Sequence, residues 1–325
     1  MKAIVYTKYG LPDVLQLKEV AKPYPKDNEV LIKVQAASIN DWDWGLLQGI
    51  PFANRLQFGL LKPQKQILGS DIAGRVEAVG KNVKQFQPGD EVFGDICGCW
   101  GGFAEYVCAR DNALTLKPAS MTFEEAAAVP QAALLALQGL RYKRQIQPGQ
   151  KVLINGAGGG AGTFAVQIAK SFGAEVTGVD STIKLDIMRS IGADQVIDYT
   201  QEDFTKNGQH YNLILDFAAY HSIFDYKRSL STKGIYVIVG GSSTRFFQTV
   251  FLGPLISMTG KKMGLLLHKP NKDLAYMIEL FEAGKVKPII DRRYPLSEVA
   301  EAFRYFGAGH ARGKVVITVE HNNKT

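Results

Sequence analysis

The stretch from Lys151 to Asp180 constrains the fold of this 325-residue chain more than any other. It reads as an apolar strand, a glycine-rich turn at 156–162, a helix with an apolar stripe, and a second apolar strand that ends in the acidic residue Asp180. This order is typical of a βαβ unit that opens with a phosphate-binding turn. Glycines let the backbone approach a pyrophosphate, and the helix that starts there offers free N–H groups.

The turn has an alternative interpretation, because ordinary tight βα turns also collect glycine for geometric reasons. The preceding strand, the following helix and the terminal acid are all present, so the sequence favours a dinucleotide site. Alanine occupies the first position of the fingerprint, which indicates a variant of the usual turn. The residues expected to hold the cofactor here are Ala157, Gly158, Gly159, Gly160, Ala161 and Gly162.

Composition places the chain among soluble globular proteins, with 46% hydrophobic and 21% charged residues, and its length suits two domains. The net charge of +7 is scattered, and nothing resembles a nucleic-acid-binding motif, so we do not expect a nucleic acid partner. Three unevenly spaced cysteines indicate free thiols in a reducing compartment. No signal peptide or membrane span is recognisable, and we expect a cytoplasmic location.

The secondary-structure signals change near residue 121. Before it, short apolar or alternating runs are separated by Gly and Pro turns, which is typical of β-rich structure. After it, strands and helices alternate as far as residue 239, which predicts an α/β fold with a parallel, doubly wound sheet. We expect a β-rich domain at 1–121, completed by 264–325, and a Rossmann cofactor domain at 122–263.

Six short motifs are spread over nearly the whole chain. They are 37–40 (Ala-Ser-Ile-Asn) with Asp43, 67–74 (Ile-Leu-Gly-Ser-Asp-Ile-Ala-Gly), 88–92 (Pro-Gly-Asp-Glu-Val), 101–107 (Gly-Gly-Phe-Ala-Glu-Tyr-Val), the turn at 157–162, and 192–194 (Gly-Ala-Asp). Together they resemble the medium-chain dehydrogenase/reductase superfamily, and most closely its zinc-independent quinone-oxidoreductase branch. The resemblance implies a GroES-like catalytic domain beside a Rossmann domain.

Many relatives in this superfamily are zinc alcohol dehydrogenases, which hold the catalytic metal with a Cys and a Gly-His-Glu motif. Here Asn40 stands in place of the Cys, Ser70 in place of the His and Asp71 in place of the Glu, and no histidine precedes His210. A catalytic zinc normally needs three protein ligands, which Asp71 alone cannot supply. The structural zinc of those relatives needs four cysteines, and the chain has three. We predict no metal.

Without a Lewis acid, the natural chemistry is hydride transfer to an acceptor that spreads charge by itself. Quinones and carbon–carbon double bonds conjugated to a carbonyl meet that requirement. The resemblance implies the same activity, NADPH-dependent reduction of quinones or enones, which we predict. Two alternatives stay open: an alcohol dehydrogenase-type oxidoreductase of the same fold, and a non-enzymatic NADPH-binding or crystallin-like protein.

Asn40 and Asp43 follow an apolar strand, in a loop that the resemblance places at the nicotinamide. We predict that Asn40 hydrogen-bonds cofactor or substrate and that Asp43 orients the loop; an Asx turn that satisfies its own backbone is the alternative. Trp44 stands where some relatives carry a tyrosine, so we expect a solvent proton. Trp44 and Phe52 are candidate walls of the acceptor site, and the segment 49–66 is the candidate for substrate choice.

The end of the second strand decides the identity of the cofactor. Asp180 is the acid that usually bonds ribose hydroxyls and favours NAD. Ser181, Lys184 and Tyr199, however, resemble the residues with which quinone-oxidoreductase relatives hold the 2′-phosphate. We predict NADPH and leave NADH open because of Asp180. The alternative for Lys184 is a solvated helix residue, and for Tyr199 an aromatic at a strand end.

Further contacts with the cofactor are expected at a strand end near residue 240 and near the C-terminus. Gly240, Gly241 and Ser242 are candidates for the carboxamide, with a plain turn as the alternative. Lys314 is placed in some relatives to reach the cofactor, but we expect a surface lysine. The resemblance also implies a homodimer paired through an edge strand, for which 235–239 and the apolar run 246–255 are candidates.

Overall fold

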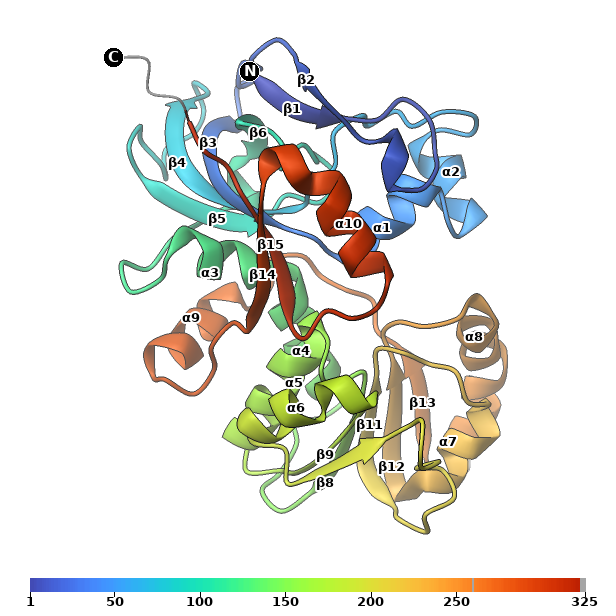
Figure 1. The fold of residues 1–325 in the computed structure, drawn as a ribbon. Coiled ribbons are helices and arrows are strands. Elements are labelled where there is room, and N and C mark those ends of the chain that lie inside the picture. The colour runs from blue at the N-terminus through green and yellow to red at the C-terminus, as the bar shows by residue number, and fades with distance from the viewer. Residues whose placement is uncertain (259, 322–325) are drawn as a thin grey trace. The chain divides into compact units, whose positions relative to one another are not determined.

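The computed structural model describes residues 1–258 and 260–321 of the chain. The chain divides into two compact units, which are drawn in Figure 1. Unit 1 comprises Met1–Gln131, Pro270–Ile278 and the C-terminal part from Ile290, and unit 2 comprises Ala132–Lys269 and Glu279–Ile289. Helix α3 (Phe123–Ala128), which follows the boundary expected at residue 121, packs on strands of unit 1.

The core of unit 2 is a six-stranded sheet in which every neighbouring pair is parallel. The strand order is β10-β9-β8-β11-β12-β13, which reverses direction between β8 and β11. In doubly wound sheets, ligands bind at the carboxyl edge beside such a reversal. The fold class predicted from the alternating pattern is therefore confirmed. The strands are β8 (Lys151–Asn155), β9 (Glu175–Asp180), β10 (Gln195–Asp198), β11 (Tyr211–Asp216), β12 (Leu230–Ile238) and β13 (Lys262–Leu265).

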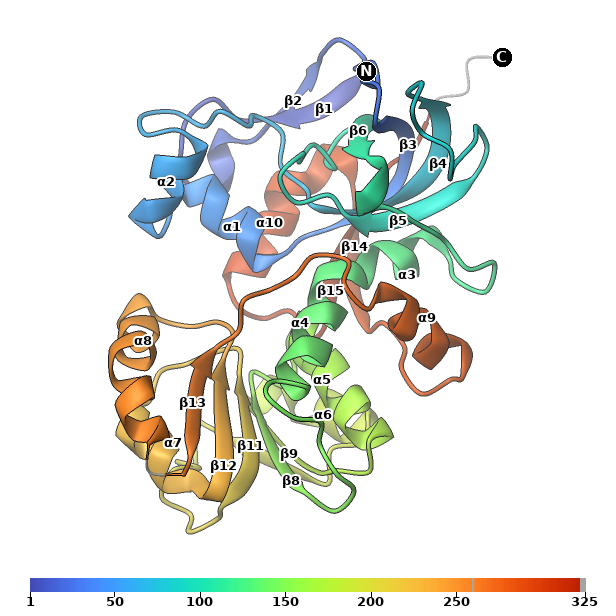
Figure 2. The ribbon, with the colours of Figure 1, turned by 180° about the vertical axis from the view of Figure 1, so that it is seen from behind.

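Helices cover both faces of this sheet, as Figures 1 and 2 show. The connections through α5 and α6 lead away from β8 in one direction, and those through α7 and α8 lead in the other, so right-handed crossovers place the two pairs on opposite faces. The candidate edge strand at 235–239 was wrong, because β12 is paired on both sides; β13 is the edge strand at that end of the sheet, and β10 is the edge strand at the other end. The helices are α4 (Pro130–Leu140), α5 (Gly160–Ser171), α6 (Leu185–Ser190), α7 (Ile223–Ser229) and α8 (Ser243–Ser257).

Unit 1 is built on a largely antiparallel sheet with the order β14-β15-β3-β4-β5-β7, and β6 also pairs with β3. The C-terminal strand β15 lies against β3, so the tail completes the N-terminal sheet. Two further strands, β1 and β2, form a separate hairpin sheet. The strands are β1 (Lys2–Val5), β2 (Gln16–Glu19), β3 (Glu29–Ser38), β4 (Asp71–Val79), β5 (Glu91–Asp95), β6 (Tyr106–Arg110), β7 (Thr115–Leu116), β14 (Ile290–Pro295) and β15 (Lys314–Thr318).

Helix α1 (Asp41–Gln48) replaces the loop that we expected after β3. Its start is fixed by Asn40 at the N-cap and Asp43 at the third helical position, a spacing that satisfies free N–H groups of the first turn. Sequence reasoning treated the two residues as loop ligands and overlooked this capping pattern. The other helices with residues in unit 1 are α2 (Phe52–Phe58), α3, α9 (Leu274–Glu282) and α10 (Val299–Gly307).

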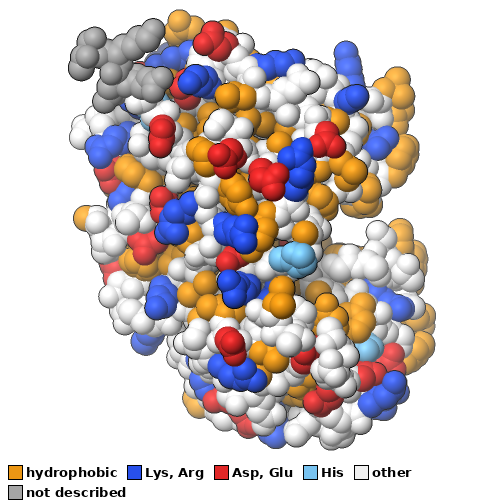
Figure 3. Space-filling model, in the orientation of Figure 1, with side chains coloured by type: hydrophobic (Ala, Val, Ile, Leu, Met, Phe, Trp, Pro, Cys, Tyr) orange, Lys and Arg blue, Asp and Glu red, His pale blue; other side chains and the backbone are white. Residues whose placement is uncertain are grey.

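Charged side chains of both signs are interspersed over the face of the molecule that Figure 3 presents. This distribution agrees with the scattered charges of the sequence. Among the described residues, no helix combines the length and the apolar character that crossing a bilayer requires.

Candidate functional site

The glycine-rich turn of unit 2 joins β8 to α5. The N–H groups of Gly156 and Ala157 both donate to the Val179 carbonyl, at 2.9 and 3.1 Å, which ties the turn to β9. A Cβ on Gly162 would lie 2.0 Å from the Gly156 oxygen, so only glycine allows α5 to start this close to the turn. Gly159 caps α5 without a side-chain acceptor. The first turn of α5 therefore keeps N–H groups for an anion.

Asp180 ends β9 and is turned toward the protein's own donors. Its Oδ2 accepts from the Gly158 N–H at 3.0 Å, and its Oδ1 accepts from the Ser181 N–H at 2.9 Å. The Lys184 ammonium lies 3.4 Å from Oδ1, and both side chains are nearly buried. Lys184 is therefore not a solvated helix residue. The negative charge of Asp180, our reason for leaving NADH open, has a cation beside it.

Tyr199 lies beside the same strand end. Its N–H donates to the Asp180 carbonyl at 3.2 Å, and its side chain is 48% exposed. Its ring is tilted against that of Tyr220, with 6.0 Å between the centroids. Ser181 begins the short turn that carries Lys184. The three candidate phosphate ligands thus surround the end of β9.

The segment 240–242 follows β12 at the carboxyl edge of the sheet. The Gly240 N–H donates to the Asp216 carbonyl at 3.2 Å. Gly241 has a φ of +120° and pairs with Ala219 after β11. A Cβ on Gly241 would meet the Ala219 nitrogen at 2.4 Å, so glycine is required for the two strand ends to approach each other. Ser242 caps α8.

Sequence reasoning missed Asp216, the last residue of β11. Its carboxylate is fully buried and accepts from Asn155 Nδ2 at 2.8 Å, from the Tyr236 hydroxyl at 3.0 Å and from the Ala218 N–H at 3.1 Å. Burial raises its pKa to about 6 against these hydrogen bonds. The group joins the ends of β8 and β11, where the strand order reverses. An acid closing an apolar strand was the signal that could have found it.

In unit 1, Asp43 anchors the start of α1. Its Oδ2 accepts from the Asn40 N–H at 3.0 Å, and its Oδ1 accepts from the Gly69 N–H at 2.9 Å. The side chain is fully buried, and burial raises its pKa to about 7. Because both oxygens are bound to backbone groups, Asp43 orients its segment and does not itself face a ligand.

Lys314 lies in the interior of unit 1, so the expected surface lysine was wrong. Only 2% of the residue is exposed, because β15 runs between β14 and β3. Its ammonium donates to Asn40 Oδ1 at 2.5 Å and to the Ile39 carbonyl at 3.3 Å, and it lies 4.0 Å from Asp71 Oδ2. Burial lowers the pKa of Lys314 and raises the pKa of Asp71. Asp71 also accepts from the Gln131 N–H.

This arrangement does not fit a catalytic zinc. Asn40 and Asp71, which stand in place of metal ligands, both lie beside the Lys314 ammonium, and a second cation there would be repelled. Over residues 1–258 and 260–321, no group of three His, Cys, Asp or Glu side chains is arranged to hold a metal ion. The three cysteines, Cys97, Cys99 and Cys108, are free and partly buried.

The two candidate substrate residues lie in different surroundings. The Trp44 ring stacks on Phe303 and is tilted against Phe306, with 6.4 Å between the centroids in each pair. It thereby fixes α1 to α10 and, partly buried, packs against the core of unit 1. Phe52, on α2, is 62% exposed. Of the two, Phe52 has the more exposed side chain.

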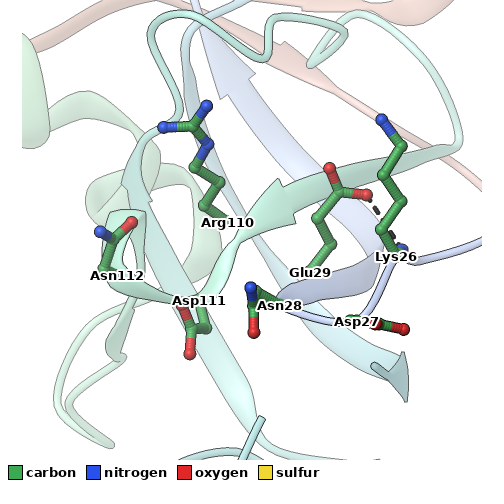
Figure 4. Close-up of a pocket in the computed structure, with 7 residues that line it drawn as sticks. All are labelled: Lys26, Asp27, Asn28, Glu29, Arg110, Asp111 and Asn112. Carbon is green, nitrogen blue, oxygen red and sulfur yellow. Dashed lines mark hydrogen bonds between the residues drawn. The ribbon is translucent and has the colours of Figure 1, made fainter. Parts of the chain in front are cut away.

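Unit 1 also carries a surface groove of about 840 Å³, shown in Figure 4. Its lining is polar and contains none of the predicted site residues. Glu29, in the groove, begins β3, whereas Ser38, next to the Asn40 segment, ends it. The groove therefore lies at the far end of that strand from Lys314 and Asn40. The lining residues are Lys26, Asp27, Asn28, Glu29, Arg110, Asp111 and Asn112.

Comparison with known families matches both parts of the chain. The family described as "Alcohol dehydrogenase GroES-like domain" matches residues 26–119, and the family described as "Zinc-binding dehydrogenase" matches residues 191–317. The second description mentions zinc, which the side chains around Lys314 do not accommodate.

Individual relatives cover almost the whole chain. A 2-methylene-furan-3-one reductase from Solanum lycopersicum is 37% identical over 98% of this chain and 79% of its own length. An NADPH-dependent alkenal/one oxidoreductase from Arabidopsis thaliana, a chloroplastic protein, is 34% identical over the same shares of the two chains. Among solved structures, the quinone oxidoreductase from Coxiella burnetii superposes with a TM-score of 0.87, at 31% identity, over 98% of this chain and 99% of that one.

Proposed function

Since the chain belongs to the quinone-oxidoreductase branch of the medium-chain dehydrogenase/reductase superfamily, we propose that it reduces quinones or α,β-unsaturated carbonyl compounds with NADPH and without a metal. The observation that carries this proposal is the pairing of two features. Unit 2 has an open phosphate-binding turn, and unit 1 has a lysine ammonium where related dehydrogenases hold their metal.

NADPH supplies the hydride when it is bound. The turn at 157–162 and the first N–H groups of α5 would hold its pyrophosphate, and Gly240, Gly241 and Ser242 would lie at the carboxyl edge near the carboxamide. Ser181, Lys184 and Tyr199 would hold the 2′-phosphate. Lys184 would favour NADPH over NADH in two ways. Its ammonium lies beside Asp180 and offsets the negative charge that would repel a 2′-phosphate, and the same ammonium can bind the phosphate directly.

The choice of acceptor follows from the side chains around Lys314, which do not suit a Lewis-acid metal. When hydride adds to the β-carbon of an enone, the electron pair of the double bond moves toward the carbonyl oxygen, and the α-carbon then takes a proton. Conjugation spreads the charge that a metal would otherwise stabilise. No side chain here is assigned as the proton donor, and we propose that the proton comes from solvent. The named activities of the tomato and Arabidopsis relatives, reductions of conjugated carbonyl compounds, support this class.

We further propose that the segment 49–66 selects the acceptor. It contains α2, whose side chains Phe52 and Leu56 are 62% and 71% exposed. An apolar surface of this kind suits a hydrophobic quinone or enone. The neighbouring Trp44 contributes by holding α1 in place.

A homodimer is also proposed, with β13 as the pairing edge in place of the strand that we first expected. Among the described residues, β13 pairs with β12 alone, which leaves one side of its backbone open. Helix α8, packed on β13, and its C-cap residue carry an exposed apolar stripe that a partner would cover. Its members are Phe247, Val250, Phe251, Leu255 and Met258. Light scattering should give twice the mass of one chain, and Phe251→Glu should lower this mass toward that of a single chain.

We also propose a cytoplasmic location, which fractionation of the native cell can test.

The proposed activity is tested by titrating the protein with NADPH and NADH and then measuring NADPH oxidation with a panel of quinones and enones. We expect tighter binding of NADPH and turnover with at least one acceptor class. Tight NADPH binding without turnover on any acceptor would favour the non-enzymatic alternative. Zinc in stoichiometric amount would favour the alcohol dehydrogenase alternative.

A further inference from the structure

A run of exposed apolar side chains surrounds helix α2 in unit 1. All seven residues of α2 are described, and none of them is buried. A helix of a soluble protein normally buries an apolar stripe, so α2 displays what such a helix usually covers. Five large apolar side chains within residues 50–61 are each more than half exposed, and Leu61, at 89%, is the most exposed of its kind among the described residues. We call the following set the α2 surface: Ile50, Phe52, Leu56, Leu60 and Leu61, with Lys62 and Lys65 at its border.

The charge around the α2 surface has one sign. Between Asp43 and Asp71 the chain carries three cations and no acid. Lys62 and Lys65, which follow the apolar residues, are both exposed. Figure 3 shows hydrophobic and basic side chains together at the edge of the molecule where Figure 1 draws α2. An apolar patch bordered by cations complements a surface that is apolar inside and anionic outside.

The inner side of α2 is fixed to unit 1. The guanidinium carbon of Arg55 lies 4.6 Å from the centroid of the Tyr9 ring, and Arg55 also donates to two backbone carbonyls of the preceding turn at 3.2 Å each. Phe58 meets the Trp100 ring edge-on, with 6.3 Å between the centroids. The exposed apolar side chains are therefore presented on a fixed support.

The form of the α2 surface suits an extended partner better than a small one. A small acceptor binds in a concave pocket that covers most of its area. Side chains that are more than half exposed stand out from the protein, so one acceptor molecule covers only part of them. Selection of the acceptor by Phe52 and Leu56 therefore leaves Ile50, Leu60 and Leu61 to be covered by something larger.

The exposed stripe of α8 suits a different partner. Residues 246–258 carry no charged side chain, and α8 packs on the edge strand β13, which favours a second copy of the chain. The α2 surface consists of a helix and the turn after it, and its border is cationic. Anionic lipid headgroups match such a border, while leucine and phenylalanine side chains enter the boundary of the acyl chains. This kind of contact lies on a membrane and needs no helix that spans it.

We propose that the α2 surface docks the protein on an anionic lipid bilayer, and that the acceptor is a quinone or enone dissolved in that bilayer. The second part rests on the proposed function, whereas the docking rests on the α2 surface alone. Docking would place the segment that selects the acceptor at the membrane, where an apolar quinone is concentrated. Each lysine close to an anionic surface strengthens binding by about fivefold, an effect that salt weakens.

The docking is tested by flotation of the full chain with vesicles, without nucleotide or acceptor. Vesicles of equal parts of phosphatidylcholine and phosphatidylglycerol are compared with vesicles of phosphatidylcholine alone. We expect binding to the mixed vesicles that is reduced by added salt, and binding to the neutral vesicles that is weaker by about tenfold or more. Absence of binding to the mixed vesicles, or equal binding to both kinds, would overturn the proposal.

Two paired substitutions locate the contact on the protein. Lys62→Gln combined with Lys65→Gln should weaken binding to the mixed vesicles by about 25-fold. Leu60→Ser combined with Leu61→Ser should weaken it by about tenfold or more, because less apolar area enters the bilayer. The substituted side chains are exposed, so the urea midpoint of both variants should match wild type. Wild-type vesicle binding by both variants would overturn the proposal.

The matched control removes two lysines elsewhere in unit 1. Lys81 and Lys84 are exposed and have the same spacing as the lysines of the α2 surface, but they follow the far end of β4 from the segment that carries α2. Lys81→Gln combined with Lys84→Gln changes the net charge equally, and its vesicle binding should stay that of wild type. A loss equal to that of the α2 lysine pair would mean that net charge alone drives binding, and would overturn the proposal.

Two further measurements separate the other occupants and the acceptor. If the wild type bound no vesicles and the paired serine variant had a smaller mass in light scattering, the α2 surface would belong to a second copy, and the proposal would fall. Wild type should oxidise NADPH faster when a long-chain quinone is carried by mixed vesicles than by neutral ones, and equal rates would overturn the second part. Vesicle binding without turnover of any acceptor would remove the proposed function and leave the docking, whereas turnover of soluble quinones without vesicle binding would remove the docking alone.

Discussion

Replacing Lys184 should abolish the proposed preference for NADPH, so that the protein binds the two nucleotides alike. In Lys184→Met the aliphatic stem still fills its nearly buried place, but the ammonium that lies 3.4 Å from Asp180 is lost. A hydrogen bond to a charged group contributes about 1.5–3 kcal/mol, which corresponds to about 10- to 150-fold in Kd for NADPH. NADH lacks the 2′-phosphate, so its Kd should change by less than about threefold.

Equilibrium titrations that follow the fluorescence of the reduced nicotinamide measure both constants on the same preparation. Lys206→Met is the matched control, because the side chain of this lysine of unit 2 is 75% exposed and pairs with Asp203, away from Asp180. Its affinity for both nucleotides should stay that of wild type. An equal loss of NADPH and NADH affinity in Lys184→Met would refute the assignment of Lys184 to the phosphate, and so would unchanged NADPH binding.

Three further predictions concern the turn, the aromatic residues and a buried acid. Gly162→Ala should lower the free energy of unfolding by about 1–3 kcal/mol and weaken the binding of both nucleotides, since its Cβ would lie 2.0 Å from the Gly156 oxygen. Urea unfolding and nucleotide titration check this, and wild-type values in both assays would contradict it. Trp44→Ala should lower the free energy of unfolding by about 3 kcal/mol, because the ring packs on Phe303. Phe52→Ala, at an exposed position, should change it by less than about 0.5 kcal/mol and alter the KM for bulky acceptors. Equal losses of stability in the two variants would contradict the different roles of the two residues. The pKa of Asp216 is raised from 3.8 to about 6, so its neutral form favours the folded state. Its contribution to the free energy of unfolding is complete below pH 3.8 and is lost as the pH rises through 6. Urea titrations should therefore show that the free energy of unfolding of the wild type falls by about 3 kcal/mol relative to that of Asp216→Asn over this pH range. Parallel changes of the two free energies with pH would contradict the prediction.

The sequence predicted the cofactor unit well because its signals are local. The strand, the turn and the helix at 151–171 carry apolar periodicity and glycines within one short stretch, and α5 begins inside the predicted turn. Helix α1 was missed because its capping residues, Asn40 and Asp43, are also typical of turns. The short edge strand β13 was missed because four residues give too little periodicity to recognise.

The polar cluster of unit 1 could not have been found by reading along the chain. The two partners of its central hydrogen bond, Lys314 and Asn40, are separated by 274 positions, and only the pairing of β15 with β3 brings them together. A lone lysine before an apolar strand reads as a surface residue. For the same reason, the ion pair of Lys184 with Asp180 could not be inferred, since the sequence does not show which way the acid turns.

The central claim is that hydride passes from NADPH to a conjugated acceptor in a site that needs no metal. The most direct measurement uses NADPH deuterated at C4 of the nicotinamide with a simple enone, in the presence of a strong chelator, followed by NMR of the product. We predict turnover with deuterium at the β-carbon and a solvent proton at the α-carbon. Deuterium at the carbonyl carbon, or activity abolished by the chelator and restored by zinc, would contradict the account.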